Sequence, residues 1–228
     1  MSYAEFYDSF LQHPFLLWVA AALGLLVALS RPGLSRAVRG FCVVLTIVAL
    51  LDAWLTTTDV PGIGALTGAA ASSIPLAFVL AGDFRYFLFV EVAQPDGTLA
   101  VSLAAVGRAC AWTLVVPVAS QLTLLAFRAD DPRVLFFVYE VLFVLLSLGI
   151  ARLYLPRHSE ALQWTRRVTR FVMGYYALWA TADAIIIATQ VDAGFLLRVL
   201  PNVLYYGGLV PVIAWAAPRV RNMIASGS

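Results

Sequence analysis

The sequence predicts an all-α integral membrane protein, a bundle of seven transmembrane helices, and three observations lead to this expectation. First, 62% of the 228 residues are hydrophobic and only 12% are charged, with a mean hydropathy of +0.88, whereas soluble domains carry about a quarter charged residues. Second, seven apolar segments are long enough to cross a hydrocarbon core of about 30 Å. Third, the basic residues gather in alternate connections. The predicted helices lie near 14–30, 38–57, 65–88, 100–127, 134–155, 168–190 and 195–217.

These helices use most of the chain, which predicts one membrane domain over 14–217 and no soluble domain. Before it, residues 1–13 have the pattern of an amphipathic helix that lies in the membrane interface. Ser2 and Glu5 have capping-box spacing, and aromatic side chains recur on one face. This stretch lacks a basic region and a clear cleavage site, so we expect no cleavable signal. Residues 218–228 are expected to form a cytoplasmic tail.

All 15 basic residues are arginines, and their positions predict the orientation of the chain. Basic residues are enriched in cytoplasmic loops, and here they follow the first, fifth and seventh helices. We therefore expect the N-terminus outside and the C-terminus in the cytoplasm, in the plasma (inner) membrane of a bacterium. The same rule explains the net charge of +2 without a nucleic-acid partner. The arginines concerned are Arg31, Arg36, Arg39, Arg157, Arg166, Arg167, Arg170, Arg219 and Arg221.

Two segments that lie far apart in the chain are similar, "DAWLTTTDV" at 52–60 and "DAIIIATQV" at 183–191. Each begins with Asp-Ala, and each places its aspartate at a similar depth in its predicted helix. The similarity predicts a parallel 3+1+3 repeat, with copies over 14–90 and 134–221 and the fourth helix as a linker. Internal repeats of this kind occur in many transporters.

Several polar residues are predicted at membrane depth in the outer half of the bundle. Asp52, Asp183 and Glu140 reach a similar level, judged by a rise of about 1.5 Å per residue. A charge at this depth is costly unless it is paired, hydrated or protonated. We therefore expect an outward-facing polar cavity in which Asp52 and Asp183 bind a proton, a cation or another small solute. The alternative is that these carboxylates only lock helices together. Further residues expected to line the cavity are Thr56, Gln121, Tyr176, Trp179 and Asn202.

A second group of charges, Asp83, Arg85 and Arg108, is expected on the inner side of the membrane. Asp83 and Arg85 are two residues apart and do not share a helical face, whereas Asp83 and Arg108 are close in depth. The sequence thus predicts an ion pair between Asp83 and Arg108 that joins the third and fourth helices. It would serve as an inner gate, or as a structural or lipid-headgroup clamp.

The sequence contains no nucleophile elbow, HExxH motif, phosphate-binding loop or dinucleotide fingerprint. His13 and His158 lie outside the predicted helices, which excludes bis-histidine haem ligation and a histidine-based metal site in the core. Since there is no lysine, a retinal Schiff base is excluded. We expect no cofactor and no metal, and an enzyme only if carboxylates alone carried the chemistry. Cys42 and Cys110 are expected to be small core residues, with a disulfide between them as the alternative.

Parts of this pattern resemble two families of seven-helix membrane proteins. The 3+1+3 plan with an external N-terminus resembles the SWEET/PQ-loop transporters, which implies transport, although the first and fifth helices here lack that family's internal proline. The stretch "LWATADAIIIATQVDAG" at 178–194 resembles the sixth helix and following turn of microbial rhodopsins. "SSIP", followed later by "AQPDGTLA", resembles their third helix and the turn after it. This resemblance implies a rhodopsin-like scaffold, but the missing lysine excludes a retinal-driven pump.

Three hypotheses about function follow. The leading one is a small membrane transporter or channel-like carrier of a proton, cation or small solute, built around the paired intramembrane carboxylates. The first alternative is a seven-helix ligand-binding sensor or receptor whose arginine-rich inner loops contact a cytoplasmic partner. The second is a structural membrane subunit, in which the carboxylates lock helices or an oligomer. The expected partners are the lipid bilayer and a small-molecule or ion substrate, with a homo-oligomer left open and no nucleic acid.

Overall fold

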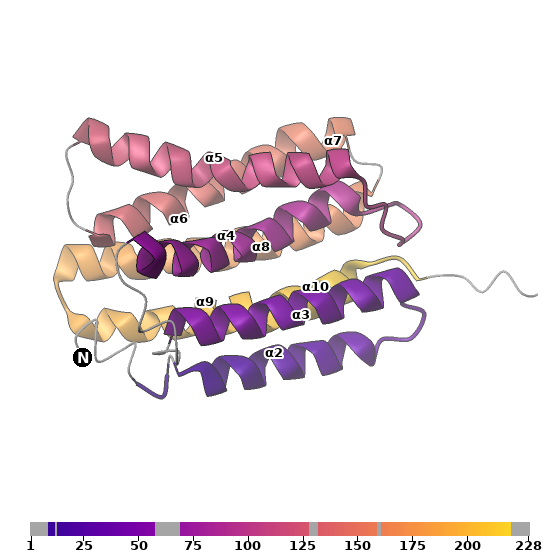
Figure 1. Cartoon of the computed structure of the whole chain (residues 1–228), viewed down its shortest axis with the longest axis horizontal. Coiled ribbons are helices and arrows are strands. Elements are labelled where there is room, and N and C mark those ends of the chain that lie inside the picture. The colour runs from indigo at the N-terminus through magenta and orange to yellow at the C-terminus, as the bar shows by residue number, and fades with distance from the viewer. Residues whose placement is uncertain (1–8, 12, 58–68, 128–131, 159–160, 220–228) are drawn as a thin grey trace, which may run out of the picture.

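The computed structural model describes residues 9–11, 13–57, 69–127, 132–158 and 161–219. Over these ranges the chain is almost entirely helical, and the helices run back and forth along one long axis (Figure 1). The first helices are α2 (Pro14–Leu29), α3 (Arg36–Thr57), α4 (Ala69–Val92) and α5 (Leu103–Phe127). The next, α6 (Pro132–Gly149), continues through a π-helical turn, η1 (Ile150–Tyr154), into α7 (Leu155–His158).

The last two passes through the bundle differ in regularity. The first of them is the long helix α8 (Leu162–Thr189). The second contains Pro201 and Pro211, which donate no backbone hydrogen bond and interrupt regular helix geometry. It is divided into the 3₁₀ helix η2 (Asp192–Arg198), α9 (Val199–Val203), the π-helical turn η3 (Leu204–Gly208) and α10 (Leu209–Ala216).

Five helical segments in the described part of the chain are long and apolar enough to cross a membrane, and α2 is apolar but shorter. The prediction of a helical, membrane-type fold is therefore confirmed, whereas the orientation of the termini and the 3+1+3 repeat stay predictions. Most of the segment 1–13 and of the tail 218–228 lies outside the described residues. The five segments are Arg36–Leu55, Leu103–Phe127, Arg133–Arg157, Gln163–Thr189 and Gly194–Ala216.

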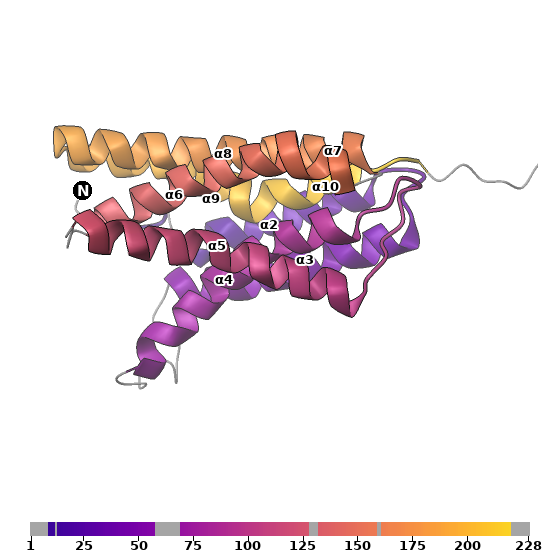
Figure 2. The ribbon, with the colours of Figure 1, turned by 90° about the horizontal axis from the view of Figure 1, so that it is seen from above.

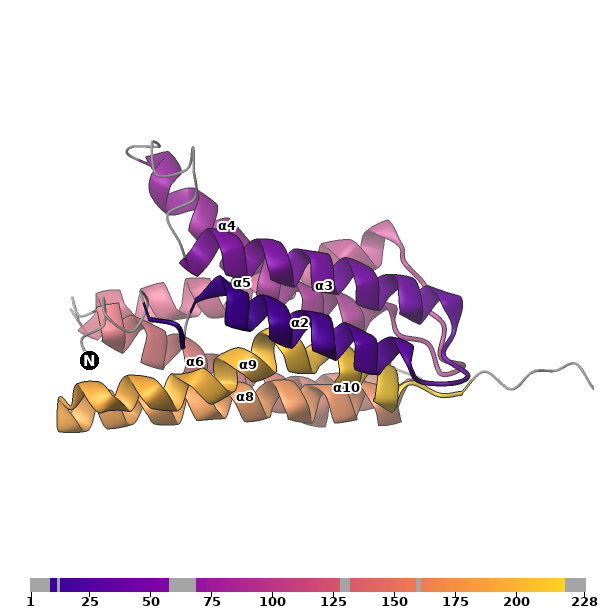
Figure 3. The same ribbon diagram turned by 90° about the horizontal axis from the view of Figure 1, so that it is seen from below.

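The helices form a closed ring in which neighbours in sequence are neighbours in space. Each of α2 to α5 packs against the next, α5 packs against α6, and α6 packs against α8. The ring closes because α10 contacts both α8 and α2 (Figure 2). The first half of α4 diverges from the other helices, as Figure 3 shows. This arrangement places α3, α4, α6, α8 and the last pass around a common interior.

Many aromatic side chains gather in the interior of the ring, whereas most of the large apolar side chains on its exterior are aliphatic. Tyr86, Phe87 and Phe143 are fully buried, and the ring of Phe143 stacks on that of Tyr176 at a centroid distance of 3.8 Å. On α5, by contrast, Leu122 and Leu125 expose most of their side chains. Exposed aliphatic side chains are suited to lipid tails, so the specific packing of this fold resides in its interior.

Helix α2 and the π-helical turn η3 approach each other closely. Pro211 has no N–H to donate to the Gly207 carbonyl four residues earlier, and this oxygen is directed at Gly24 on α2. A Cβ atom at Gly24 would overlap the Gly207 oxygen, and a Cβ at Gly207 would lie 2.6 Å from the Ala20 oxygen. Both glycines are therefore required for backbone-to-backbone contact, as in many membrane helix pairs.

At one end of the bundle, the connections after α2 and α4 and the end of α10 meet. Ser35 Oγ donates a hydrogen bond to the Gly97 carbonyl at 2.8 Å, and a Cβ at Gly97, whose φ is +79°, would approach the Pro218 carbonyl at 3.0 Å. Asp96 accepts hydrogen bonds from the Thr98 backbone N–H and hydroxyl, which lowers the pKa of Asp96 below its ordinary value. This end carries the predicted inner arginines and is called the basic end below.

Candidate functional site

Two aspartates and one arginine meet in the middle of the bundle. Asp52 on α3 is 1% exposed, Asp83 on α4 is 2% exposed, and Arg85 on α4 is buried beside them. We call these three residues, with the surrounding tyrosines Tyr139, Tyr176, Tyr205 and Tyr206, the central cluster. With all three charged groups ionised, it would carry one net negative charge.

Asp83 is held by two tyrosines from different helices. The hydroxyls of Tyr139 on α6 and Tyr176 on α8 each donate a hydrogen bond to one oxygen of the Asp83 carboxylate. The stacking of Phe143 on Tyr176 fixes the orientation of that phenol ring. Asp83 therefore joins α4, α6 and α8 through charge-assisted hydrogen bonds, which are stronger than neutral ones.

Asp52 faces the last pass of the bundle and Arg85. The hydroxyls of Tyr205 and Tyr206 on η3 lie close to its carboxylate, and Arg85 is its main neighbouring cation. The Arg85 guanidinium lies 4.8 Å from the centre of the Tyr205 ring, and its Nη1 donates to the Leu45 carbonyl at 3.4 Å. Arg85 thus interacts electrostatically with both aspartates, and an aromatic ring face and a backbone oxygen stabilise its guanidinium.

The position of Tyr205 depends on a glycine in α4. A Cβ atom at Gly82 would overlap the Tyr205 hydroxyl oxygen, so only glycine leaves space for this phenol between α4 and Asp52. Next to it, Trp179 Nε1 donates a hydrogen bond to Asn202 Oδ1 at 2.8 Å, and its ring lies 5.3 Å from that of Tyr205. The predicted residues Tyr176, Trp179 and Asn202 therefore lie in or beside the central cluster.

Asp183 belongs to a second buried cluster, located toward the end opposite the basic end. Arg198 on η2 binds the carboxylates of both Asp183 and Glu140, the latter at 3.4 Å. Arg133 on α6 binds Asp183 at 3.1 Å and lies 4.7 Å from the centre of the Phe195 ring. We call Arg133, Glu140, Asp183 and Arg198 the outer cluster. The two negative charges of its carboxylates are balanced by the two positive charges of its guanidinium groups.

A third cluster lies near the basic end and corrects the expected pairing of Arg108. Arg108 on α5 binds Glu91 on α4 at 2.6 Å, not Asp83, which is held by tyrosines. Glu91 also accepts hydrogen bonds from Trp112 Nε1 at 3.0 Å and from the Tyr154 hydroxyl at 2.8 Å. The Glu91 side chain is 2% exposed and that of Arg108 is 53% exposed. Arg108 pairs with Glu91 and not with Asp83 because Glu91 and Arg108 both lie close to the connection between α4 and α5, at a similar depth in the bundle.

The structure also changes the expected relation between Asp52 and Asp183. The contacts of Asp52 are with α4 and η3, whereas those of Asp183 are with α6 and η2. The two side chains therefore belong to different clusters, and a cavity that both share stays a prediction. Gln121 is exposed on α5 and joins neither cluster, and the side chain of Thr56 lies outside the described residues. Glu140 does lie beside Asp183, through their shared Arg198.

Several residues of these clusters were not predicted from the sequence. They include Arg133 and Arg198, although two arginines close in sequence to the predicted helices that carry Glu140 and Asp183 are a signal of pairing. Arg133 and Glu140 are seven residues apart and so share one helical face.

Both cysteines are free thiols, and Cys42 lies in the core as expected. Cys110 differs from the expectation of a core residue, because it lies on the exposed face of α5.

No group of three or more His, Cys, Asp or Glu side chains that could hold a metal ion occurs in the part of the chain that the structure describes. The clusters instead combine carboxylates with arginine, tyrosine and tryptophan donors, which suit the binding and transfer of protons or the coordination of a small cation by oxygen. Comparisons with family models, with curated proteins and with solved structures give no significant match for this chain.

Proposed function

We propose that this protein is a small membrane carrier that moves a proton or another small cation, with the central cluster as its binding site. The observation that carries the proposal is the charge of that cluster. Among the described side chains of the central cluster, two buried aspartates, Asp52 and Asp83, meet one buried arginine, Arg85, which gives the cluster a formal charge of −1. An uncompensated charge at this depth is costly. A bound proton would remove it, and a small cation held by carboxylate and phenol oxygens would balance it.

The other two clusters extend the proposed path toward both ends. On α8, Asp183 lies seven residues from Tyr176, which corresponds to about 10 Å along the helix. On α4, Glu91 lies eight residues from Asp83, or about 12 Å. Buried carboxylates therefore recur at three levels, each with hydroxyl or guanidinium neighbours. Chains of such groups carry protons in pumps and transporters.

The outer cluster has a different proposed role, because its charges balance. Arg198 bridges Glu140 on α6 and Asp183 on α8, so opening the bundle at this end requires breaking these ion pairs. We infer that it is a gate rather than a second cation site. This replaces the idea of one outward-facing cavity shared by Asp52 and Asp183.

The orientation predicted by the arginines can be measured by cysteine labelling in cells. In a Cys110→Ala background, Pro32→Cys and Gln163→Cys should be protected from a membrane-impermeant maleimide, because the basic end is expected in the cytoplasm. Val191→Cys, in the exposed turn after α8, should be labelled. The reverse pattern would place the N-terminus inside and reverse the assignment of outer and inner clusters.

Transport is tested by proton uptake into proteoliposomes that contain the purified protein and a pH-sensitive dye, under an imposed membrane potential. We expect Asp83→Asn and Asp52→Asn each to lower the uptake rate at least about a hundredfold, the lower end of the loss typical of a proton-transfer group. Asp96→Asn, in the exposed turn after α4, is the matched control and should retain the wild-type rate.

Full uptake by the Asp52→Asn/Asp83→Asn double variant would refute the central cluster as the site. If the wild-type protein moved neither protons nor Na⁺, the carrier proposal would fail as a whole. The sensor and the structural subunit would then be the remaining hypotheses.

A further inference from the structure

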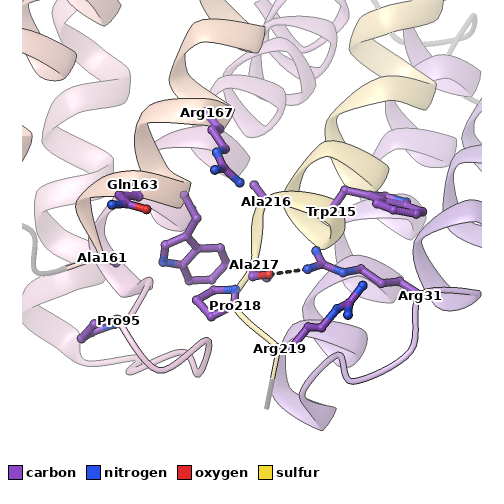
Figure 4. Close-up of a pocket in the computed structure, with 11 residues that line it drawn as sticks. Arg31, Pro95, Ala161, Gln163, Arg167, Trp215, Ala216, Ala217, Pro218 and Arg219 are labelled. Atoms are coloured by element: carbon purple, nitrogen blue, oxygen red, sulfur yellow. Dashed lines mark hydrogen bonds between the residues drawn. The ribbon is translucent and has the colours of Figure 1, made fainter. Parts of the chain in front are cut away.

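A cavity of about 560 Å³ opens at the basic end between α8, the end of α10 and the connection after α2. Three arginines line it: Arg167 approaches from α8, and Arg31 and Arg219 from the opposite side (Figure 4). None of the described residues that line it is acidic. The central cluster and its proposed transport role play no part in this site.

Arg31 is fixed in place by the end of the last helix. Its guanidinium donates hydrogen bonds to the carbonyls of Ala214 and, at 2.7 Å, Ala217, which lack helical donors at this helix end. Burial lowers the pKa of Arg31, and the positive charges of Arg219 and Arg167 lower it further. Three cations thus face one another across the cavity, which is unfavourable without an anion between them.

The remaining polar groups in the cavity wall are also able to donate hydrogen bonds. Arg167 and Arg219 form no hydrogen bond or ion pair with another residue in the described ranges, and Gln163 is exposed at the rim. Trp164 lines the cavity and is 3% exposed, and its indole Nε1 has no hydrogen-bond partner among the described residues. Guanidinium forks and an indole N–H match the several oxygens of a phosphate group.

The surroundings of the cavity favour a lipid as the source of that phosphate. Trp215 is 56% exposed beside the Arg31 guanidinium, which lies 5.7 Å from the centre of its ring. On the adjacent helix α2, Leu26 and Val27 are also exposed. Tryptophan is enriched at the level of the lipid headgroups. A bound lipid would therefore have apolar surface for its chains directly beside the arginines.

We propose that this cavity binds the phosphate ester of an anionic phospholipid from the leaflet at the basic end. Basic pockets between transmembrane helices on the cytoplasmic side are known to bind anionic headgroups. Arg167 and Arg219 would bind the phosphate oxygens, and Arg31 would contribute charge while it holds the end of α10.

The test is native mass spectrometry of the purified protein with phosphatidylglycerol or phosphatidylcholine added. The double variant Arg167→Gln/Arg219→Gln should bind phosphatidylglycerol about 25-fold more weakly than the wild type, since each arginine near a membrane surface contributes about a fivefold effect. The matched control, Arg157→Gln/Arg170→Gln, removes the same charge from exposed positions of the same end outside the cavity and should bind almost as the wild type does.

Three results would overturn the proposal. Equal binding of phosphatidylcholine and phosphatidylglycerol by the wild type would show that the anionic headgroup is not recognised. An equal loss of phosphatidylglycerol binding in the control variant would show that the lipid is attracted to the positive charge of this end in general and not to a specific binding site. Displacement of phosphatidylglycerol by millimolar inorganic phosphate would assign the cavity to a soluble phosphate compound and not to a lipid.

Discussion

Replacing Arg198 by glutamine is expected to lower the free energy of unfolding by about 3–5 kcal/mol, the usual cost of removing one partner from a buried ion pair. Arg198 binds both Glu140 and Asp183, and all three side chains are almost completely buried. Without it, two carboxylates would compete for Arg133 alone. The measurement is thermal or denaturant unfolding of the purified protein in detergent micelles.

A second substitution tests whether charge is the cause. Arg198→Gln combined with Glu140→Gln leaves one carboxylate, Asp183, with one guanidinium, Arg133, and should recover more than half of the loss. Arg152→Gln, at an exposed position of η1, should change the unfolding free energy by less than about 0.5 kcal/mol. Wild-type stability in the Arg198→Gln variant would contradict the outer cluster as described.

Gly24→Ala is expected to destabilise the protein by about 3 kcal/mol, at the upper end of the usual cost of overpacking. The added methyl would overlap the Gly207 carbonyl oxygen, which is a backbone atom and has no alternative rotamer. The contact between α2 and η3 would have to widen, and this contact also closes the ring of helices. Unfolding midpoints of the purified variants in micelles report the effect.

Gly107→Ala on α5 is the matched control for this substitution. A Cβ atom there meets nothing within 4 Å, so alanine should stabilise the helix by about 0.5–1 kcal/mol. If Gly24→Ala and Gly107→Ala shifted the midpoint in the same direction, the close contact between α2 and η3 would not exist.

The sequence predicts which charged residues are buried in the bundle, but neither their exact level nor the rotation of each helix. Asp52 and Asp183 are predicted at similar depths, and both are buried, yet Asp52 lies in the central cluster and Asp183 in the outer cluster, nearer to one end. The neighbour that each aspartate faces depends on the order of the helices in the ring. The hydropathy of the sequence carries no information about this order. Asp52 meets Arg85 and η3, whereas Asp183 meets Arg133 and η2. The pairing of charges therefore had to come from the structure.

The predicted helix boundaries are correct where a helix ends together with its apolar run. They are wrong where a helix continues into polar residues. The predicted helix near 14–30 agrees closely with α2, but α8 begins at Leu162 and not near 168. Its first turns contain Arg166 and Arg167, which hydropathy excludes from a membrane segment although they are compatible with a helix. The π-helical turns η1 and η3 shift hydrogen bonds by one residue and leave no pattern in hydrophobicity.

The depth of the central cluster has an electrical consequence. Asp83 lies near the middle of α4, so a cation that enters from either end crosses roughly half of the transmembrane voltage before it is bound. Moving one elementary charge across the whole membrane changes its energy by about 2.3 kcal/mol for each 100 mV of membrane potential. Half of it, about 1.2 kcal/mol, corresponds to roughly a sevenfold change in occupancy. A charge site at this level would make the protein respond to membrane potential even when the ion concentrations on both sides are equal.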